Sequence, residues 1–185
     1  MSETSNKTAT RSVALVDADS NAATSMLLAD AVEALPVYAR LSGVAAPELV
    51  RAAAGADVAR CDTALLALTL GSAAARVEEL SLGYAPAGAR VYALLCVDDD
   101  PGVATHALAA LEERCGELGL AWMGGLAVGD ASLLPQMARR PRMGWARRRV
   151  SEAMDQLLIA LLAHQPFGEK YVRPSRYARL TCRPR

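Results

Sequence analysis

The stretch TALLALT at residues 63–69 decides the fold class of this chain of 185 residues. It carries no charge and is shorter than a typical helix, which is typical of a strand buried on both faces. Three similar runs surround it in the chain: SVALV at residues 12–16, RVYALLCV at residues 90–97 and LAWMGGLAV at residues 120–128. Strands buried on both faces occur in parallel sheets that helices cover on either side.

Helical patterns separate these runs. The expected helices cover residues 24–35, 47–54, 71–82, 101–118 and 145–163. A weaker run at residues 37–41 is expected to form the second strand. Five strands that alternate with helices predict an α/β fold, with a doubly wound five-stranded parallel sheet in the order 2-1-3-4-5 inside a three-layer sandwich. In such a fold, ligands bind at the carboxyl ends of strands 1, 3 and 4.

The two ends of the chain differ from its middle. Residues 1–11 are polar and rich in Ser and Thr, so we predict a disordered lead, followed by one domain over residues 12–164. Residues 165–185 form a basic tail that we expect to pack on the domain or on a partner. No run approaches the roughly 18–20 apolar residues of a membrane span, and the N-terminus lacks the apolar core of a signal peptide. We therefore expect a cytoplasmic protein that does not contact a membrane.

The cysteines give no sign of a metal site. They lie far apart in the sequence and include no Cys-x-x-Cys pair, at Cys61, Cys96, Cys115 and Cys182. Free thiols in a reducing compartment are the default for such a pattern, and no metal is expected.

Charge is divided unevenly along the chain, although the net charge is zero. Residues 1–135 hold 8 basic and 17 acidic side chains, whereas residues 136–185 hold 12 basic and 3 acidic ones. Six arginines and Trp145 lie within residues 139–149. This basic half is expected to dock on its own chain or on a second subunit, and we predict a homodimer in which it crosses to the partner. An anion site stays open as an alternative; nucleic acid is not expected, because no DNA-binding motif is present.

Two segments resemble a known family. VYALLC at residues 91–96 ends a strand in cysteine, and LAWMGGLAVG at residues 120–129 follows as the next strand, ahead of Leu133, Leu134 and the last helix after Gly144. In this order of strands and glycines, residues 62–162 resemble flavodoxin-like NAD(P)H-dependent FMN reductases. The resemblance implies a flavodoxin-like oxidoreductase that binds FMN at the strand ends and passes hydride from NAD(P)H through the flavin to an acceptor.

The resemblance also implies which loops hold FMN. The first loop would bind the phosphate with backbone N–H groups and hydroxyls at a helix N-terminus. Its candidate cofactor-binding residues are Asp19, Ser20, Asn21, Thr24 and Ser25. The second loop contributes Thr69, Leu70, Gly71 and Ser72, and the third loop with the helix after it contributes Cys96, Asp98 and His106. No catalytic residue is assigned.

Carboxylates stand where an anionic cofactor would arrive. The first loop lacks glycine and contains Asp17 and Asp19, and strand 4 runs into three acids at residues 98–100. Repulsion predicts weak FMN binding. We expect Asp19 to be its main cause and Asp17 to point away, so that an Asp19→Gly variant binds better at little cost in stability. The alternative function is a degenerate flavodoxin-fold binding or assembly module without a cofactor, and the alternative for this loop is a plain helix N-cap.

Overall fold

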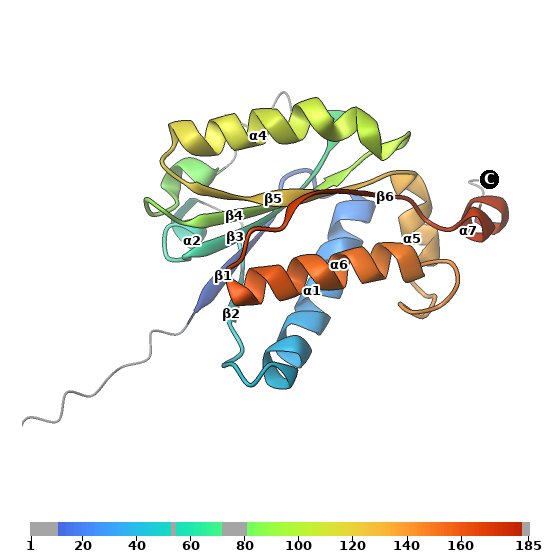
Figure 1. The fold of residues 1–185 in the computed structure, drawn as a ribbon, viewed down its shortest axis with the longest axis horizontal. Helices are drawn as coiled ribbons and strands as arrows, with labels where there is room; N and C mark the ends of the chain where they lie inside the picture. Colours follow the sequence, from blue (N-terminus) through green and yellow to red (C-terminus); the bar gives the residue numbers. More distant parts are fainter. Residues whose placement is uncertain (1–10, 53–54, 72–80, 183–185) are drawn as a thin grey trace, which may run out of the picture.

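The computed structural model of the protein describes residues 11–52, 55–71 and 81–182. In these residues a six-stranded parallel sheet has the order β2-β1-β3-β4-β5-β6 (Figure 1). The strands are β1 (Ser12–Asp17), β2 (Glu48–Arg51), β3 (Thr63–Thr69), β4 (Arg90–Cys96), β5 (Ala121–Val128) and β6 (Gly168–Val172). The α-helices are α1 (Ala22–Leu41), α2 (Gly55–Val58), α4 (Thr105–Glu117), α5 (Leu134–Met137), α6 (Arg148–Ala163) and α7 (Arg176–Thr181). Short 3₁₀ turns are η1 (Ser81–Tyr84), η2 (Pro101–Ala104) and η3 (Ala131–Leu133).

Helices cover both faces of the sheet, as the alternation of strands and helices predicts. α4 lies on one face, and α1 and α6 pack together on the other (Figure 1). Tyr92 and Leu65 point into the core beneath α1 and α6, whereas Leu66 and Leu95 belong to the core beneath α4. β3 and β4 are buried on both faces, which explains why Arg90, the partly exposed first residue of β4, is the one charged residue in the two strands.

The second strand lies later in the chain than predicted. Residues 37–41 were expected to form it, but α1 continues through Pro36 as far as Leu41. Ala31, Leu35 and Ala39 are buried four residues apart on this helix, while Pro36 faces solvent. The helical spacing therefore outweighs the proline. β2 instead falls within residues 47–54, where a helix was expected, and only Val50 of this short edge strand is buried.

The basic tail adds a sixth strand, so the prediction of five strands is wrong. β6 pairs in parallel with β5, outside the predicted order 2-1-3-4-5. A glycine pair permits the close approach: Gly124 has a φ of 114°, and a Cβ there would lie 2.1 Å from the Gly168 carbonyl oxygen. The residues of β6 (GEKYV) are polar and mostly exposed, which suits an edge strand and hides it from a search for apolar runs.

The helix expected at residues 71–82 falls almost wholly outside the described residues, and the other boundaries agree with the sequence to within a few residues. The helix expected after strand 4 begins as η2 and continues as α4, and the last helix begins at Arg148 rather than Trp145. The predicted lead falls almost wholly on residues outside the described ones; Arg11, the first described residue, donates a hydrogen bond to the Leu162 carbonyl. Among the described residues, none of the helices combines the length and apolar character that crossing a membrane requires.

Candidate functional site

A cleft of about 340 Å³ opens at the carboxyl ends of β1, β3 and β4, where this fold class places its ligands. The ends of β3 and β4, the loop after β1 and the turn after β5 contribute its lining. The lining residues are Asn21, Thr69, Leu70, Gly71, Cys96, Val97, Asp98, Ala131, Ser132 and Pro135. Asp98 is the sole charged side chain among them, so the cleft has no lining cation to meet an anionic ligand.

Asp17 organises the loop between β1 and α1. Its carboxylate accepts hydrogen bonds from the Ser20 backbone N–H (3.1 Å), the Thr24 hydroxyl (2.8 Å) and the Ser25 hydroxyl (2.7 Å). Ser20 takes a left-handed conformation with a φ of 50°, which directs its N–H back at Asp17. Asn21 caps α1 by accepting from the Ala23 N–H at 2.8 Å. The Asp17 carboxylate thus accepts hydrogen bonds from the kinds of group that, in a phosphate-binding loop, donate to the phosphate.

Asp19 joins this loop to the end of β3. Its carboxylate accepts a short hydrogen bond from the Thr69 backbone N–H, and the neighbouring Ala18 N–H donates to the Ala67 carbonyl at 2.9 Å. The expectation that Asp17 points away and Asp19 faces a phosphate is therefore reversed: Asp17 is the centre of the loop and Asp19 holds the adjacent strand. An Asp19→Gly variant would lose a contact across the sheet, so its stability is expected to fall.

The acidic run after β4 is paired within the chain. Asp98 accepts from the Ser132 N–H at 3.0 Å, and Asp100 caps η2 through the Gly102 N–H at 2.9 Å. Arg173, just after β6, donates two hydrogen bonds to Asp130 at 2.9 and 3.0 Å and one to Asp100 at 3.0 Å. An arginine of the basic tail thus pairs with two acids of the body within one chain.

Cys96 lines the cleft, and its surroundings do not favour the thiolate form. Its side chain is 1% exposed. Burial is the main cause that raises the pKa of the Cys96 thiol to about 12, and the charges of Asp17, Asp19 and Asp98 add to it. Reactive thiols have a lowered pKa in electropositive surroundings, and this one has the opposite.

The structure brings together half of the residues predicted for the site. Those in the cleft lining are Asn21, Thr69, Leu70, Gly71, Cys96 and Asp98. Asp19 and Ser20 in the first loop, and Thr24 and Ser25 in the first turn of α1, lie outside the lining, and Thr24 is fully buried. His106 is exposed on α4 and does not line the cleft, and Ser72 lies outside the described residues.

Sequence reasoning missed the side of the cleft that follows β5. Ala131, Ser132 and Pro135 line it, and Ser132 donates its backbone N–H to Asp98. The signal was present: a loop directly after a parallel strand lies at the same edge of the sheet as its neighbours. In the described residues, no group of three or more His, Cys, Asp or Glu side chains is arranged to hold a metal ion.

Comparison with known proteins adds little to this geometry. No family model matches the chain, and no curated protein matches it. A solved structure described as a conserved hypothetical protein from Sinorhizobium meliloti 1021 shares 16% sequence identity, with a TM-score of 0.38. That match covers 93% of this chain and 58% of the other, so the chain spans little more than half of that protein's length.

Proposed function

We propose that this protein is a flavodoxin-fold binding or assembly module that works without FMN. One observation carries the proposal: Asp17 already receives the Ser20 N–H and the Thr24 and Ser25 hydroxyls. These are the kinds of donor with which a phosphate-binding loop at a helix N-terminus holds its anion. The residues therefore do not fit the phosphate of FMN, because its donors are bound and a fixed negative charge stands among them.

The electrostatics point the same way. Two unit charges about 5 Å apart repel by roughly 3 kcal/mol at an effective dielectric constant near 20, and a phosphate carries nearly two charges at neutral pH. A single such contact weakens binding about a hundredfold. Asp98 lines the cleft, and Asp17 and Asp19 lie outside the lining but close enough that their charges help to raise the pKa of Cys96, so all three carboxylates oppose an anion in the cleft.

The cleft suits a small ligand, or a partner's side chain, that carries no negative charge. Its lining includes the polar residues Asn21, Thr69 and Ser132 and the acidic residue Asp98. A neutral polar group or a cation would find acceptors there without repulsion. We therefore assign the cleft to binding rather than to flavin chemistry.

Titration with FMN tests the proposal. Quenching of flavin fluorescence by the wild-type protein should give a Kd weaker than about 100 µM, equivalent to less than about 5.5 kcal/mol of binding free energy. The purified protein should be colourless, without the flavin band near about 450 nm. Asp98→Asn, which removes one charge from the lining, should bind FMN more tightly than wild type. Glu113→Gln, an exposed change on α4 outside the lining, is the matched control and should not. A yellow protein, or micromolar binding by wild type, would overturn the proposal.

The second candidate is an FMN-dependent NAD(P)H oxidoreductase, favoured by the position of the cleft at the ends of β1, β3 and β4. Thr69 and Gly71 line it, where a flavin ring could approach. An assay that follows the oxidation of NADPH or NADH by its absorbance, with FMN added, separates the two candidates. Turnover that requires FMN, at a rate that Asp98→Asn in the cleft lining changes, would favour the oxidoreductase.

A further inference from the structure

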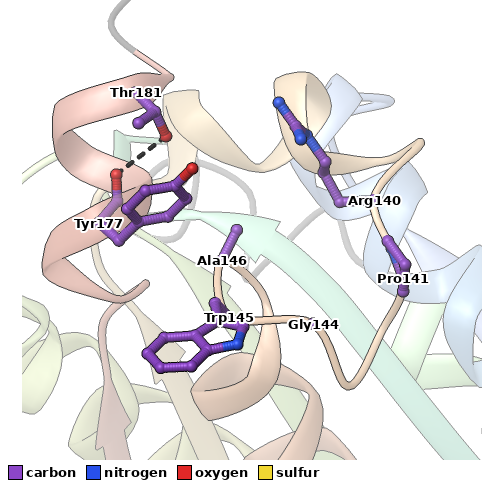
Figure 2. Close-up of a pocket in the computed structure, with 7 residues that line it drawn as sticks. All are labelled: Arg140, Pro141, Gly144, Trp145, Ala146, Tyr177 and Thr181. Carbon is purple, nitrogen blue, oxygen red and sulfur yellow. Dashed lines mark hydrogen bonds between the residues drawn. The ribbon is translucent and has the colours of Figure 1, made fainter.

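A second cavity, of about 380 Å³, lies between the α5–α6 loop and α7 (Figure 2). Its lining residues are Arg140, Pro141, Gly144, Trp145, Ala146, Tyr177 and Thr181. The two aromatic side chains are unusually exposed, Trp145 at 86% and Tyr177 at 56%. Tryptophan is highly buried on average, so a nearly free indole on a cavity wall indicates a surface that meets a ligand.

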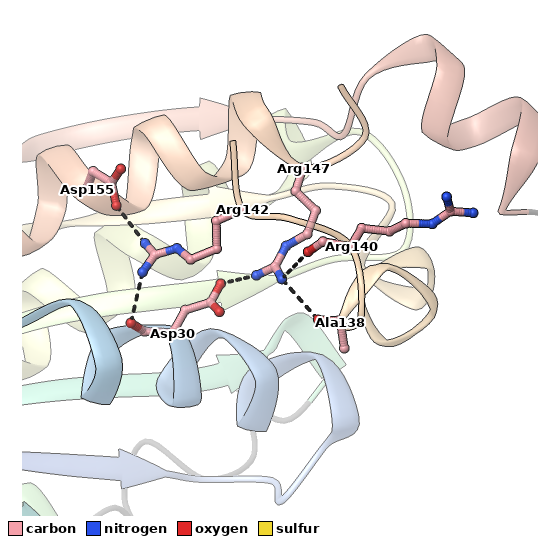
Figure 3. Close-up of polar contacts among 6 residues, drawn as sticks. All are labelled: Asp30, Ala138, Arg140, Arg142, Arg147 and Asp155. Carbon is pink, nitrogen blue, oxygen red and sulfur yellow. Dashed lines mark hydrogen bonds and ion pairs between the residues drawn. The ribbon is translucent and has the colours of Figure 1, made fainter. Parts of the chain in front are cut away.

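The loop that carries Trp145 is held in place from beneath (Figure 3). The buried Arg147 pairs closely with Asp30 of α1 and donates to the carbonyls of Ala138 and Arg140, both at 3.2 Å. Arg142 pairs with Asp155 of α6 at 2.6 Å and donates to the Asp30 carbonyl at 3.3 Å. A cavity whose wall is fixed before binding loses less conformational entropy when it is filled.

The other wall is equally well defined. Tyr177 and Thr181 lie one turn apart on α7, and the Thr181 hydroxyl donates to the Tyr177 carbonyl at 2.9 Å (Figure 2). Ser175 caps this helix by accepting from the Ala178 N–H, and Ala178 and Cys182 are buried beneath it. The ring of Tyr177 is thus presented from a fixed helix.

The cavity lining carries one positive side chain, Arg140, which no carboxylate of the described residues pairs with. The lining contains no carboxylate. Arg140 extends away from the buried pairs in Figure 3, although its carbonyl is held by Arg147. Within the described residues, no salt bridge is formed by Arg139, Arg140, Arg149 or Arg176. The expected occupant is therefore an anion that also has a flat or apolar part.

We propose that this cavity binds a nucleoside phosphate, with the base against Trp145 and Tyr177 and the phosphate at Arg140. Aromatic rings stack on any base, and the guanidinium fork of arginine matches the oxygens of a phosphate. A compact cavity suits a single base better than an acidic peptide, which would need an extended groove. The ligand is either a free nucleotide or one residue of a single strand, since both present the same base and phosphate. The site is separate from the cleft at the strand ends and does not depend on the function proposed for it.

The test uses adenosine 5′-monophosphate and a ten-residue deoxyadenosine strand as probes, with calorimetry and tryptophan fluorescence as readouts. Both probes should quench Trp145, and the one with the lower Kd identifies the source of the ligand. Trp145→Ala should weaken binding roughly fivefold to a hundredfold, the range measured for single stacking contacts. Arg140→Gln should weaken it as well and should reduce the salt dependence of strand binding by about one phosphate contact.

Two control variants match these changes. Met143→Ala alters an exposed side chain of the same loop outside the lining, and Arg40→Gln removes an exposed arginine from the last turn of α1. Neither should change the Kd. Thermal melting checks that Trp145→Ala, which removes an exposed side chain, stays folded.

Four results would overturn the proposal. The first is no binding of either probe at millimolar concentration, and the second is equal binding by wild type and both cavity variants. The third is binding of adenosine as tight as that of its monophosphate, because Arg140 would then hold no phosphate. The fourth is a wild-type dimer that Trp145→Ala or Arg140→Gln dissociates in sedimentation, which would make the cavity a contact between subunits.

Discussion

Two regions of this protein concentrate charge and use it in opposite ways. At the carboxyl ends of the strands, Asp17, Asp19 and Asp98 each accept hydrogen bonds from their own chain. Around the cavity beside α7, Arg147 and Arg142 form ion pairs within the chain, whereas Arg139 and Arg140 are exposed to solvent. The difference teaches that pairing, rather than the number of charges in the sequence, decides whether a charged segment can bind a ligand.

The largest expected effect concerns the buried ion pair that supports the cavity. Arg147→Ala leaves Asp30 as a buried unpaired charge and frees the carbonyls of Ala138 and Arg140. Loss of one partner of such a pair typically costs about 3–5 kcal/mol. Urea unfolding should show a drop of that size, whereas Arg149→Ala, an exposed arginine two residues later, should unfold almost like wild type. A loss below about 1 kcal/mol for Arg147→Ala would mean that the loop is not held in this way.

A smaller effect is expected from the buried thiol of Cys96 in the cleft lining. Because the pKa of Cys96 is raised from 9.0 to about 12, the folded protein keeps this proton where the unfolded chain has lost it. Stability is therefore full below about pH 9 and falls as pH rises toward about 12, by up to about 1.4 kcal/mol per pH unit for one thiol. Burial also raises the pKa of Cys115, to about 11, so it acts in the same direction.

Cys96→Ala should reduce this alkaline loss of stability, measured by unfolding between pH 8 and pH 10, and leave the part that comes from Cys115. An exposed serine-to-alanine change, Ser132→Ala, is a control on the cleft wall that carries no titrating group. In the native protein Cys96 should also resist alkylation at pH 8. Rapid modification of Cys96 would contradict both its burial and the raised pKa.

The smallest effect concerns the Arg173 clamp, the set of hydrogen bonds from Arg173 to Asp100 after β4 and to Asp130 after β5. Arg173→Gln removes two hydrogen bonds to Asp130 and one to Asp100, all partly exposed, and should cost about 1 kcal/mol. Hydrogen exchange should accelerate in β6 and at the ends of β4 and β5. Arg176→Gln, an exposed arginine of α7 without a salt bridge among the described residues, is the matched control. Unchanged exchange in β6 would show that the sheet edge holds without the clamp.

Much of the fold could be predicted from the sequence, because its central strands are buried on both faces. TALLALT and RVYALLCV can satisfy their backbone and their apolar side chains only inside a covered parallel sheet. The two edge strands were not predicted, because they lack this burial on both faces. β2 buries only Val50, and β6 is polar, so neither produces an apolar run. Pro36 misled the assignment of α1, whose buried residues keep helical spacing on both sides of it.

The candidate site was less predictable than the fold. Residue types at the strand ends indicated its position, and six of the predicted residues line the cleft. The roles of Asp17 and Asp19 depend on which hydrogen-bond donors face them in the folded loop. Neither the spacing nor the composition of the sequence indicates how those donors are oriented. The pairing of Arg142, Arg147 and Arg173 within the chain was likewise not predictable, because their carboxylate partners lie 13 to 117 residues away in the sequence.

The most direct test asks whether Asp17 stands in for a phosphate. Asp17→Ala removes the carboxylate and leaves the Ser20 N–H and the hydroxyls of Thr24 and Ser25 without their acceptor. If inorganic phosphate occupies that place with millimolar affinity, a tenfold excess over Kd stabilises the variant by about 1.4 kcal/mol, or about 3–5 °C in Tm. Asp17→Asn, which keeps an acceptor, covers the case in which the alanine variant does not fold, and chloride at equal ionic strength is the control. The account predicts that phosphate raises the Tm of the Asp17 variant well above its effect on wild type. An equal response in the two proteins would contradict it.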